Sequence, residues 1–292
     1  MKRMIAAALV TGALGGLCSG CGLFQKKEEP QQNEGGDQNA NQGGGGSGID
    51  PTTMVQATSP VQVSPQMKVG WHIKQEMKAS GQTMATSYSI VGETGDSWQM
   101  EHMNPGLAGL ANSMPDLKGM IIGLTVRKED GKVTKAVLGK PGEAGKEIKI
   151  MEAPTGTAKG PEGTDEDVKL KIGTYPAKKF VTDLGQGGKT TTWVGNGGDL
   201  NGVLLKSDGA GGNYELAKEP SDSQVKVGDA NLTVTEYAYT NGMTYWVSSG
   251  DPVVAAFFPY GDEGRGIFKL TTEGSQMEIV ELGTAAKPQL KW

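Results

Sequence analysis

The segment MKVGWHIKQEM, residues 67–77, constrains the fold more than any other part of this 292-residue chain. Its apolar residues Met67, Val69, Trp71, Ile73 and Met77 all fall at odd-numbered positions, whereas the even-numbered positions carry mostly charged residues and a histidine. Successive side chains of a β-strand point to opposite faces of a sheet, so this alternation predicts a strand with one buried face.

Turn signals and further strand-like runs follow at short spacing along the chain. GETGD at 92–96 and EDGK at 129–132 supply the glycine and aspartate that tight hairpin turns favour. The runs between turns include TMATSYSIV, SWQMEHM, EIKIM, VKLKI, KKFVTD, LTVTEYAY and MEIVEL. We predict an all-β domain over residues 67–292, a curved antiparallel sheet that is either a half-open barrel or sandwich-like. GLAGLANSM, residues 106–114, is the candidate for at most one short helix.

Two later segments resemble each other and predict an internal duplication over residues 167–218 and 225–273. GGKTTTWVGNGGDLNGVLL aligns with TNGMTYWVSSGDPVVAAFF, which pairs Thr191 with Thr244, Trp193 with Trp246 and Val194 with Val247. VKLKIG and VKVG precede the two copies. The alternative is a pair of unrelated hairpins that share common turn residues.

The stretch GQGGKT, residues 185–190, looks like the end of a phosphate-binding loop. That motif needs a glycine five positions before Gly188, where this chain has Asp183, and it must open a helix. TTTWV follows instead, which favours a strand. We therefore interpret GQGGKT as a hairpin turn.

The N-terminus predicts a lipoprotein signal peptide over residues 1–20. Lys2 and Arg3 precede an apolar run that is too short to span a bilayer, and LCSGC then resembles a lipobox that ends at Cys21. Cys18 is a competing position, and an ordinary secretory signal with an incidental cysteine is the alternative. Since Cys18 and Cys21 are the only cysteines, cleavage before Cys21 would leave a single thiol, which lipid attachment would use.

Residues 21–66 are rich in Gly, Gln, Asn and Pro, with few apolar side chains to bury. This composition predicts a disordered tether between the lipid anchor and the domain.

The formal net charge of −5 and the lack of a basic cluster argue against nucleic-acid binding. The two histidines, His72 and His102, lie within predicted strands, and no nucleophile-elbow serine accompanies them. We expect no enzymatic activity, no catalytic residues and no cofactor.

Two sets of residues are candidates for binding. Met100, His102 and Met103 offer thioether and imidazole groups that suit Cu(I), although a core strand explains the same pattern. Methionines also concentrate between residues 54 and 120, which is compatible with a concave surface for acyl chains or with a gap-filled core. The candidate ligand or core anchors are Trp71, Trp98, Met100, Trp193 and Trp246.

The order of these features resembles an uncharacterised group of bacterial envelope lipoproteins that look like the LolA/LolB/LppX superfold. The matching pieces are LCSGC, VGWHIKQEM, SIVGETGDSWQMEHM and YPAKKFVTD leading to TTWVGNGGDLNGVLL. The resemblance implies a curved antiparallel sheet around an apolar cavity and the binding of lipids or lipoprotein acyl chains, with no catalytic residue to carry over.

We therefore expect an envelope lipoprotein, anchored in the outer membrane through lipidated Cys21, that binds an apolar ligand or an envelope partner. A structural or interaction lipoprotein without a ligand cavity is the alternative, and a periplasmic Cu(I)-binding module is a further one. The protein partners, the ligand and the side of the membrane stay open.

Overall fold

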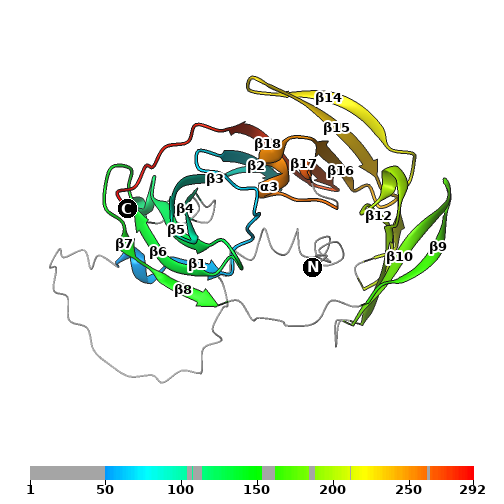
Figure 1. Ribbon diagram of the computed structural model, residues 1–292, viewed down its shortest axis with the longest axis horizontal. Coiled ribbons are helices and arrows are strands. Elements are labelled where there is room, and N and C mark those ends of the chain that lie inside the picture. Colours follow the sequence, from blue (N-terminus) through cyan, green and yellow to red (C-terminus); the bar gives the residue numbers. More distant parts are fainter. Residues whose placement is uncertain are drawn as a thin grey trace, which may run out of the picture.

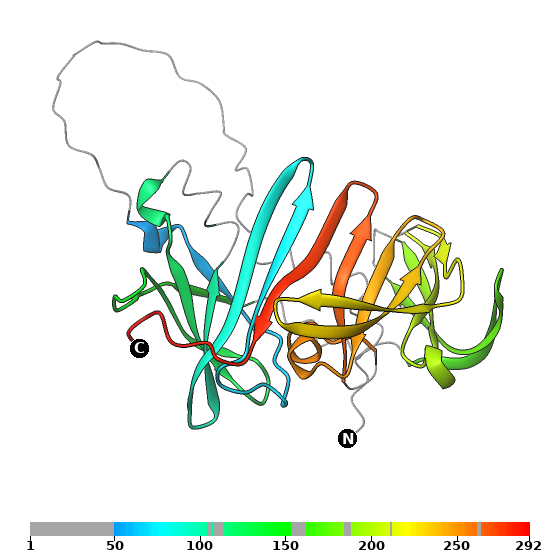
Figure 2. The same cartoon turned by 90° about the horizontal axis from the view of Figure 1, so that it is seen from above.

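The computed structural model describes residues 50–103, 107, 114–152, 162–183, 188–210, 212–261 and 264–292. Within these residues the protein consists of three β-sheets with one short α-helix and three 3-10 turns. Figures 1 and 2 show that the largest sheet is strongly curved and does not close on itself. The predicted all-β fold of curved antiparallel sheet is confirmed. Cys21 and the predicted signal peptide over residues 1–20 lie outside the described residues.

The largest sheet has eleven strands, and its centre joins a late strand of the chain to an early one. In spatial order the strands are β14 (Ser221–Val227), β15 (Ala230–Ala238), β16 (Thr244–Ser249), β17 (Arg265–Thr272), β18 (Ser275–Gly283), β2 (His72–Ala79), β3 (Gln82–Thr94), β4 (Ser97–Met103), β5 (Ile121–Arg127), β6 (Val133–Gly139) and β7 (Lys146–Glu147). All ten neighbouring pairs are antiparallel, including β18 with β2. The middle strand of the sheet is therefore β2, which begins at His72, inside the predicted strand segment 67–77, while Val69 of that segment is exposed.

A five-stranded antiparallel sheet packs beside the large one. Its order is β13 (Tyr214–Glu215), β12 (Leu204–Gly209), β11 (Lys189–Gly195), β10 (Gly173–Asp183) and β9 (Thr164–Leu170). A bridge between Leu216 and Tyr239 connects the end of β13 to the end of β15. GQGGKT precedes and enters β11, and Gly188 has a positive φ of 85°, as a turn between β10 and β11 requires.

The predicted boundary of the tether at residue 66 is wrong. A 3-10 turn at Pro51–Thr53 leads into β1 (Gln56–Ser59), which pairs in parallel with β8 (Lys149–Glu152). Val55 and Ala57 are buried in a core cluster with strands of the large sheet. These residues fold because β8, almost a hundred residues away in sequence, supplies the pairing edge. Residues 21–49 lie outside the described part of the chain.

The α-helix is α3, Pro252–Phe257, in a segment where we expected only an apolar run. The carboxylate of Asp251 accepts hydrogen bonds from the backbone N–H groups of Val253 and Val254, and Pro252 opens the first turn. The predicted helix at 106–114 falls outside the described residues, except for Leu107 and Met114. Leu107 is buried in the core.

The helix α3 fills an opening in the large sheet. β17 and β18 pair only over four residues next to their turn, from Lys269–Glu278 to Thr272–Ser275. Where the strands diverge, Val254 of α3 packs with Phe268 and Ile279 in one hydrophobic cluster. A Cβ added at Gly266 would lie 2.6 Å from the carbonyl of Val254, so this glycine allows the helix to approach β17.

The C-terminal residues return to the sheet and are held by a buried carboxylate. Glu101 is 3% exposed and accepts hydrogen bonds from the N–H groups of Gln289 and Leu290, at 2.8 to 3.0 Å. Leu290 packs with Ile121 and Val137. The indole of Trp292 also donates to Glu101. The end of the chain is therefore an integral part of the fold.

The two segments that we aligned have the same strand order and register. We call β9–β13 unit A and β14–β18 unit B. In unit A a bulge follows Trp193, and Val194 pairs with Leu204; in unit B a bulge follows Trp246, and Val247 pairs with Ile267. Each unit begins with a hairpin closed by a two-residue turn and has a short helical connection after its third strand.

Candidate binding site

Three of the five predicted anchors are core residues. Trp71, Trp98 and Met100 are 6%, 7% and 3% exposed and belong to the cluster between β1 and strands β2 to β6. The ammonium group of Lys128 lies 4.3 Å from the ring centroid of Trp98. These side chains therefore pack the domain and leave no surface for a ligand.

The other two anchors, Trp193 and Trp246, are half-buried and are covered by lysines. Lys179 and Lys206 lie 5.5 and 5.1 Å from the centroid of Trp193, and Lys269 lies 5.2 Å from that of Trp246. The indole N–H of Trp193 also donates to Glu166 at 2.5 Å, which lowers the pKa of that carboxyl. The two tryptophans occupy equivalent positions of units A and B.

The candidate copper ligands do not converge. Met100 and His102 share a strand face, but Met103 is 41% exposed and lies on the opposite face. The imidazole of His102 stacks on Tyr88 at 4.4 Å, and its Nδ1 lies 3.2 Å from the carbonyl oxygen of Ser87. Desolvation lowers the pKa of His102 to about 4, so the ring is neutral at pH 7. The described residues contain no group of three His, Cys, Asp or Glu that could hold a metal.

A row of methionines that the sequence does not reveal crosses the middle of the large sheet. Met277 of β18 pairs with Met77 of β2, and Met77 pairs with Met84 of β3. Leu270 of β17 continues the row beyond Met277. Residues directly opposite in neighbouring strands share a face. We call Met277, Met77 and Met84, together with Leu270 beside Met277, the methionine row. Met277 is buried, whereas Met77 and Met84 are half-buried.

The next row on the same face has a buried polar residue at its centre. Gln75 lies between Ile279 of β18 and Thr86 of β3, two residues along each strand from the methionine row. Gln75 is 3% exposed, and its Oε1 has no hydrogen-bond partner within the described residues. Leaving a buried carbonyl unpaired costs about 1–3 kcal/mol, which a bound donor would recover. The sequence gives one indication that Gln75 is unusual, because it is a polar residue that alternates with the apolar residues Ile73 and Met77 on the predicted buried face of the strand.

The surroundings of these two rows are uncharged. The following row places Ile73 opposite Tyr88, and Tyr88 opposite the neutral His102. Phe257 and Phe258, at the end of α3, each lie 6.3 Å from the ring of Tyr88. We define the inner-face site as the methionine row together with Gln75 and Thr86. It brings together thioether and apolar side chains and one buried acceptor, Oε1 of Gln75, that has no hydrogen-bond partner within the described residues.

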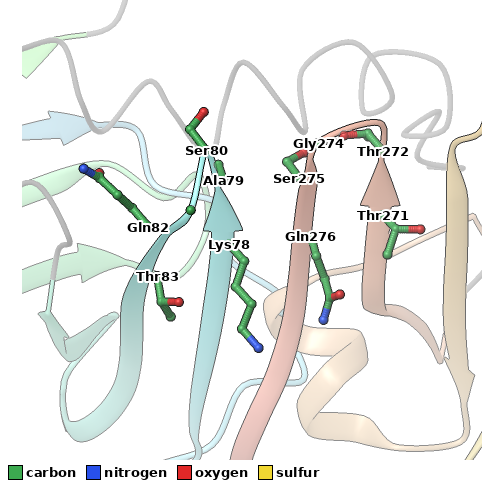
Figure 3. Close-up of a pocket in the computed structure, with 11 residues that line it drawn as sticks. Lys78, Ala79, Ser80, Gln82, Thr83, Thr271, Thr272, Gly274, Ser275 and Gln276 are labelled. Atoms are coloured by element: carbon green, nitrogen blue, oxygen red, sulfur yellow. Dashed lines mark hydrogen bonds between the residues drawn. The ribbon is translucent and has the colours of Figure 1, made fainter.

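A groove of about 400 Å³ lies at the tips of two hairpins, β2–β3 and β17–β18 (Figure 3). Its lining comes mostly from lysine, threonine, serine and glutamine side chains, with Ala79 and two glycines, and it includes no methionine or tryptophan. Lys78, Gln276 and Thr271 lie opposite one another in three neighbouring strands. Their parity places them on the face opposite to the methionine row. This groove is therefore not a methionine-lined concave surface of the kind with which the sequence is compatible.

No protein-family model matches the sequence, and a search of curated proteins found no match. Among solved structures, one match is MucB in complex with MucA(peri), with 12% sequence identity and a TM-score of 0.20. The alignment covers 77% of this chain and 93% of that chain. A TM-score this low supports no inference about a shared fold or function. Among the described residues, no helix is long and apolar enough to cross a membrane.

Proposed function

We propose that this chain is a membrane-tethered binding protein of the bacterial envelope that holds an acyl chain at its inner-face site and performs no chemistry. The observation that carries the proposal is the methionine row beside the unpaired carbonyl of Gln75. An apolar chain would lie along Met77 and Met84, and a hydroxyl or amide N–H at its polar end would donate to Gln75.

The chemistry of the site supports an uncharged, flexible ligand. Methionine is unbranched and polarizable, and its thioether adapts to apolar partners of varied shape. No lysine or arginine faces the ligand from the rows that define the site. A free carboxylate or phosphate would therefore find no counter-ion there, which favours an esterified or amidated acyl chain.

The test measures binding of a long-chain fatty acid amide that carries an environment-sensitive fluorophore. The full chain in detergent-free nanodiscs should bind this probe, and a Met77→Glu, Met84→Glu double variant should bind at least roughly tenfold more weakly, because each carboxylate would be buried against the acyl chain. Met103→Glu is the matched control, since Met103 is exposed on the opposite face of β4. Equal binding by all three proteins would contradict the proposal.

The membrane tether is the second part of the proposal. We place the anchor at Cys21, with the protein in the cell envelope at the outer membrane. Metabolic labelling with a palmitate analogue tests this assignment. The wild-type chain should take up label and sediment with membranes, whereas a Cys21→Ser chain that still does both would overturn the anchor.

A structural lipoprotein without a ligand is the second candidate. The packing of Trp71, Trp98 and Met100 in the core, and the lysines over Trp193 and Trp246, favour it, because these large apolar side chains already have protein contacts. Mass spectrometry of material released from the purified full chain separates the two candidates. A co-purified lipid that is lost in the double variant supports binding, and a wild-type chain that is empty and does not bind the probe supports the structural role.

A further inference from the structure

The strand β14 forms one edge of the eleven-stranded sheet, and no strand in the described part of the chain pairs with its outer side. Figure 1 shows β14 at the rim of the molecule, with β15 on its inner side. An unpaired strand edge presents a row of free N–H and C=O groups to any chain that approaches it.

The register identifies which residues of β14 present these groups. Val227 pairs with Ala230 across a two-residue turn, and the closing pair of such a hairpin exchanges both backbone hydrogen bonds. The hydrogen-bonded pairs then alternate along the ladder, so Val225 and Ser223 also bond to β15. Asp222, Gln224 and Lys226 therefore direct their N–H and C=O groups outward.

These three residues can pair with the same three residues of a second copy of the chain. If a second copy approaches with its β14 antiparallel and a twofold axis passes through Gln224, Gln224 pairs with Gln224 of the second copy. Asp222 then lies opposite Lys226 of the second copy, and the same contact repeats on the other side of the axis. All three side chains are exposed, and none of the ion pairs within the described residues involves Lys226.

The equivalent edge of unit A is protected against such pairing. In β9 the outward positions are Asp165, Asp167 and Lys169, because Leu170 and Gly173 close the corresponding hairpin. A twofold axis at the equivalent position would set Asp167 against Asp167, and like charges directly opposite each other destabilise a strand pair. The same strand in the other unit carries the neutral Gln224 at this point.

We propose that two copies of this chain associate through their β14 edges, antiparallel about Gln224, to form one continuous sheet across the dimer. The inference rests on the edge and its charges and is independent of any ligand at the inner-face site.

A proline variant tests the backbone pairing. Gln224→Pro removes an outward N–H that β15 does not use, and edge strands tolerate proline at such positions. Sedimentation of the full chain in detergent should show a dimer for the wild type and a monomer for Gln224→Pro, with unchanged circular dichroism. Asp167→Pro, at the equivalent place in β9, is the matched control and should remain dimeric. A wild-type chain that is monomeric at all concentrations, or a dimer that survives Gln224→Pro, overturns the proposal.

A charge exchange tests the register. Asp222→Lys alone sets lysine against lysine, and Lys226→Asp alone sets aspartate against aspartate, so each variant should dimerise roughly tenfold more weakly than the wild type. Mixing the two variants restores both opposite-charge contacts and should give a heterodimer of nearly wild-type affinity. Failure of the mixture to associate overturns the antiparallel register. Crosslinking of Gln224→Cys to a different protein in cells, with no dimer band, overturns the choice of partner.

Discussion

Units A and B have the same strand order, register and bulge, yet they have different surroundings in the molecule. Unit A ends in the two-residue strand β13, and its sheet stops there. Unit B ends in the nine-residue strand β18, which pairs with β2 and continues the sheet for six more strands. One arrangement of strands therefore forms a separate sheet in one place and is extended by further strands in the other.

The helical connections of the two units pack against different strands. In unit A the 3-10 turn Gly198–Leu200 lies over β11, where a Cβ added at Gly195 would lie 2.0 Å from the carbonyl oxygen of Leu200. In unit B, α3 lies over β17 at Gly266. The position equivalent to Gly195 is Ser248, and the position equivalent to Gly266 is Val203. A glycine thus marks the strand that each connection approaches.

The units also differ in what their equivalent faces contact. Unit B contributes Tyr239 and Tyr245 to the hydrophobic cluster that it shares with unit A, and the Tyr239 hydroxyl donates to the carbonyl of Leu204 in unit A at 2.8 Å. The equivalent positions of unit A are Thr182, which is exposed, and Thr192, which is half-buried. The comparison teaches that a few side chains decide which neighbour a unit accepts, while the strand register is kept.

The largest effect is expected where α3 approaches β17. Gly266→Val, which installs the unit A residue in unit B, should lower the free energy of unfolding by about 4 kcal/mol, because the new side chain overlaps the backbone of α3. The converse change on the facing strand, Ser248→Gly, should cost only about 1 kcal/mol. Chemical denaturation measures both. Similar costs for the two variants would mean that the glycine position does not determine how the connection packs.

The tyrosines at the junction predict a loss of stability in alkali. Burial raises the pKa of Tyr260 to about 12, and it also raises the pKa of Tyr239 and Tyr245. In the unfolded chain tyrosine ionises near pH 10, so the folded state retains protons that the unfolded state has lost, and stability falls as the pH rises above 10. Tyr260→Phe should recover about 2 kcal/mol of that loss at pH 12. Urea denaturation at pH 8 and at pH 12 provides the measurement, and equal losses in both proteins would contradict the assignment.

The sequence predicted the parts of this fold that depend on local pattern. The alternation around Ile73 places a strand with a buried face, and the turns expected at GETGD and EDGK each contain a glycine with a positive φ, Gly95 and Gly131. The helix α3 was not predictable in this way, because a short apolar run such as VVAAFF fits a buried strand equally well. The methionine row was also hidden, since the pairing of Met277 with Met77 joins strands two hundred residues apart.

A smaller effect is expected from the cap of α3. Asp251→Ala removes the acceptor of two backbone N–H groups and should cost about 1 kcal/mol. Asp199, which aligns with Asp251 in unit A, lies inside a 3-10 turn that has no side-chain cap, so Asp199→Ala should change stability by less than about 0.5 kcal/mol. Thermal or chemical denaturation measures the difference, and an equal cost for the two variants would show that Asp199 caps its turn in solution.

The smallest effect concerns the lysines over the equivalent tryptophans. Lys269→Met should cost about 0.5 kcal/mol, because Trp246 loses the ammonium group above its ring while the apolar stem of the side chain is retained. Lys206→Met should lower the free energy of unfolding by less, because Lys179 of β10 still covers Trp193. In unit B the residue that pairs with Trp246 at the position of Lys179 is Glu236, which cannot replace the lost ammonium group. Paired denaturation curves in low salt resolve the difference, and a Lys179→Met, Lys206→Met double variant should lose more than the sum of the two single changes. If the loss of stability in the double variant equals the sum of the two single losses, the two lysines act on Trp193 independently. Unit A would then differ from unit B here only in having two lysines over its tryptophan where unit B has one.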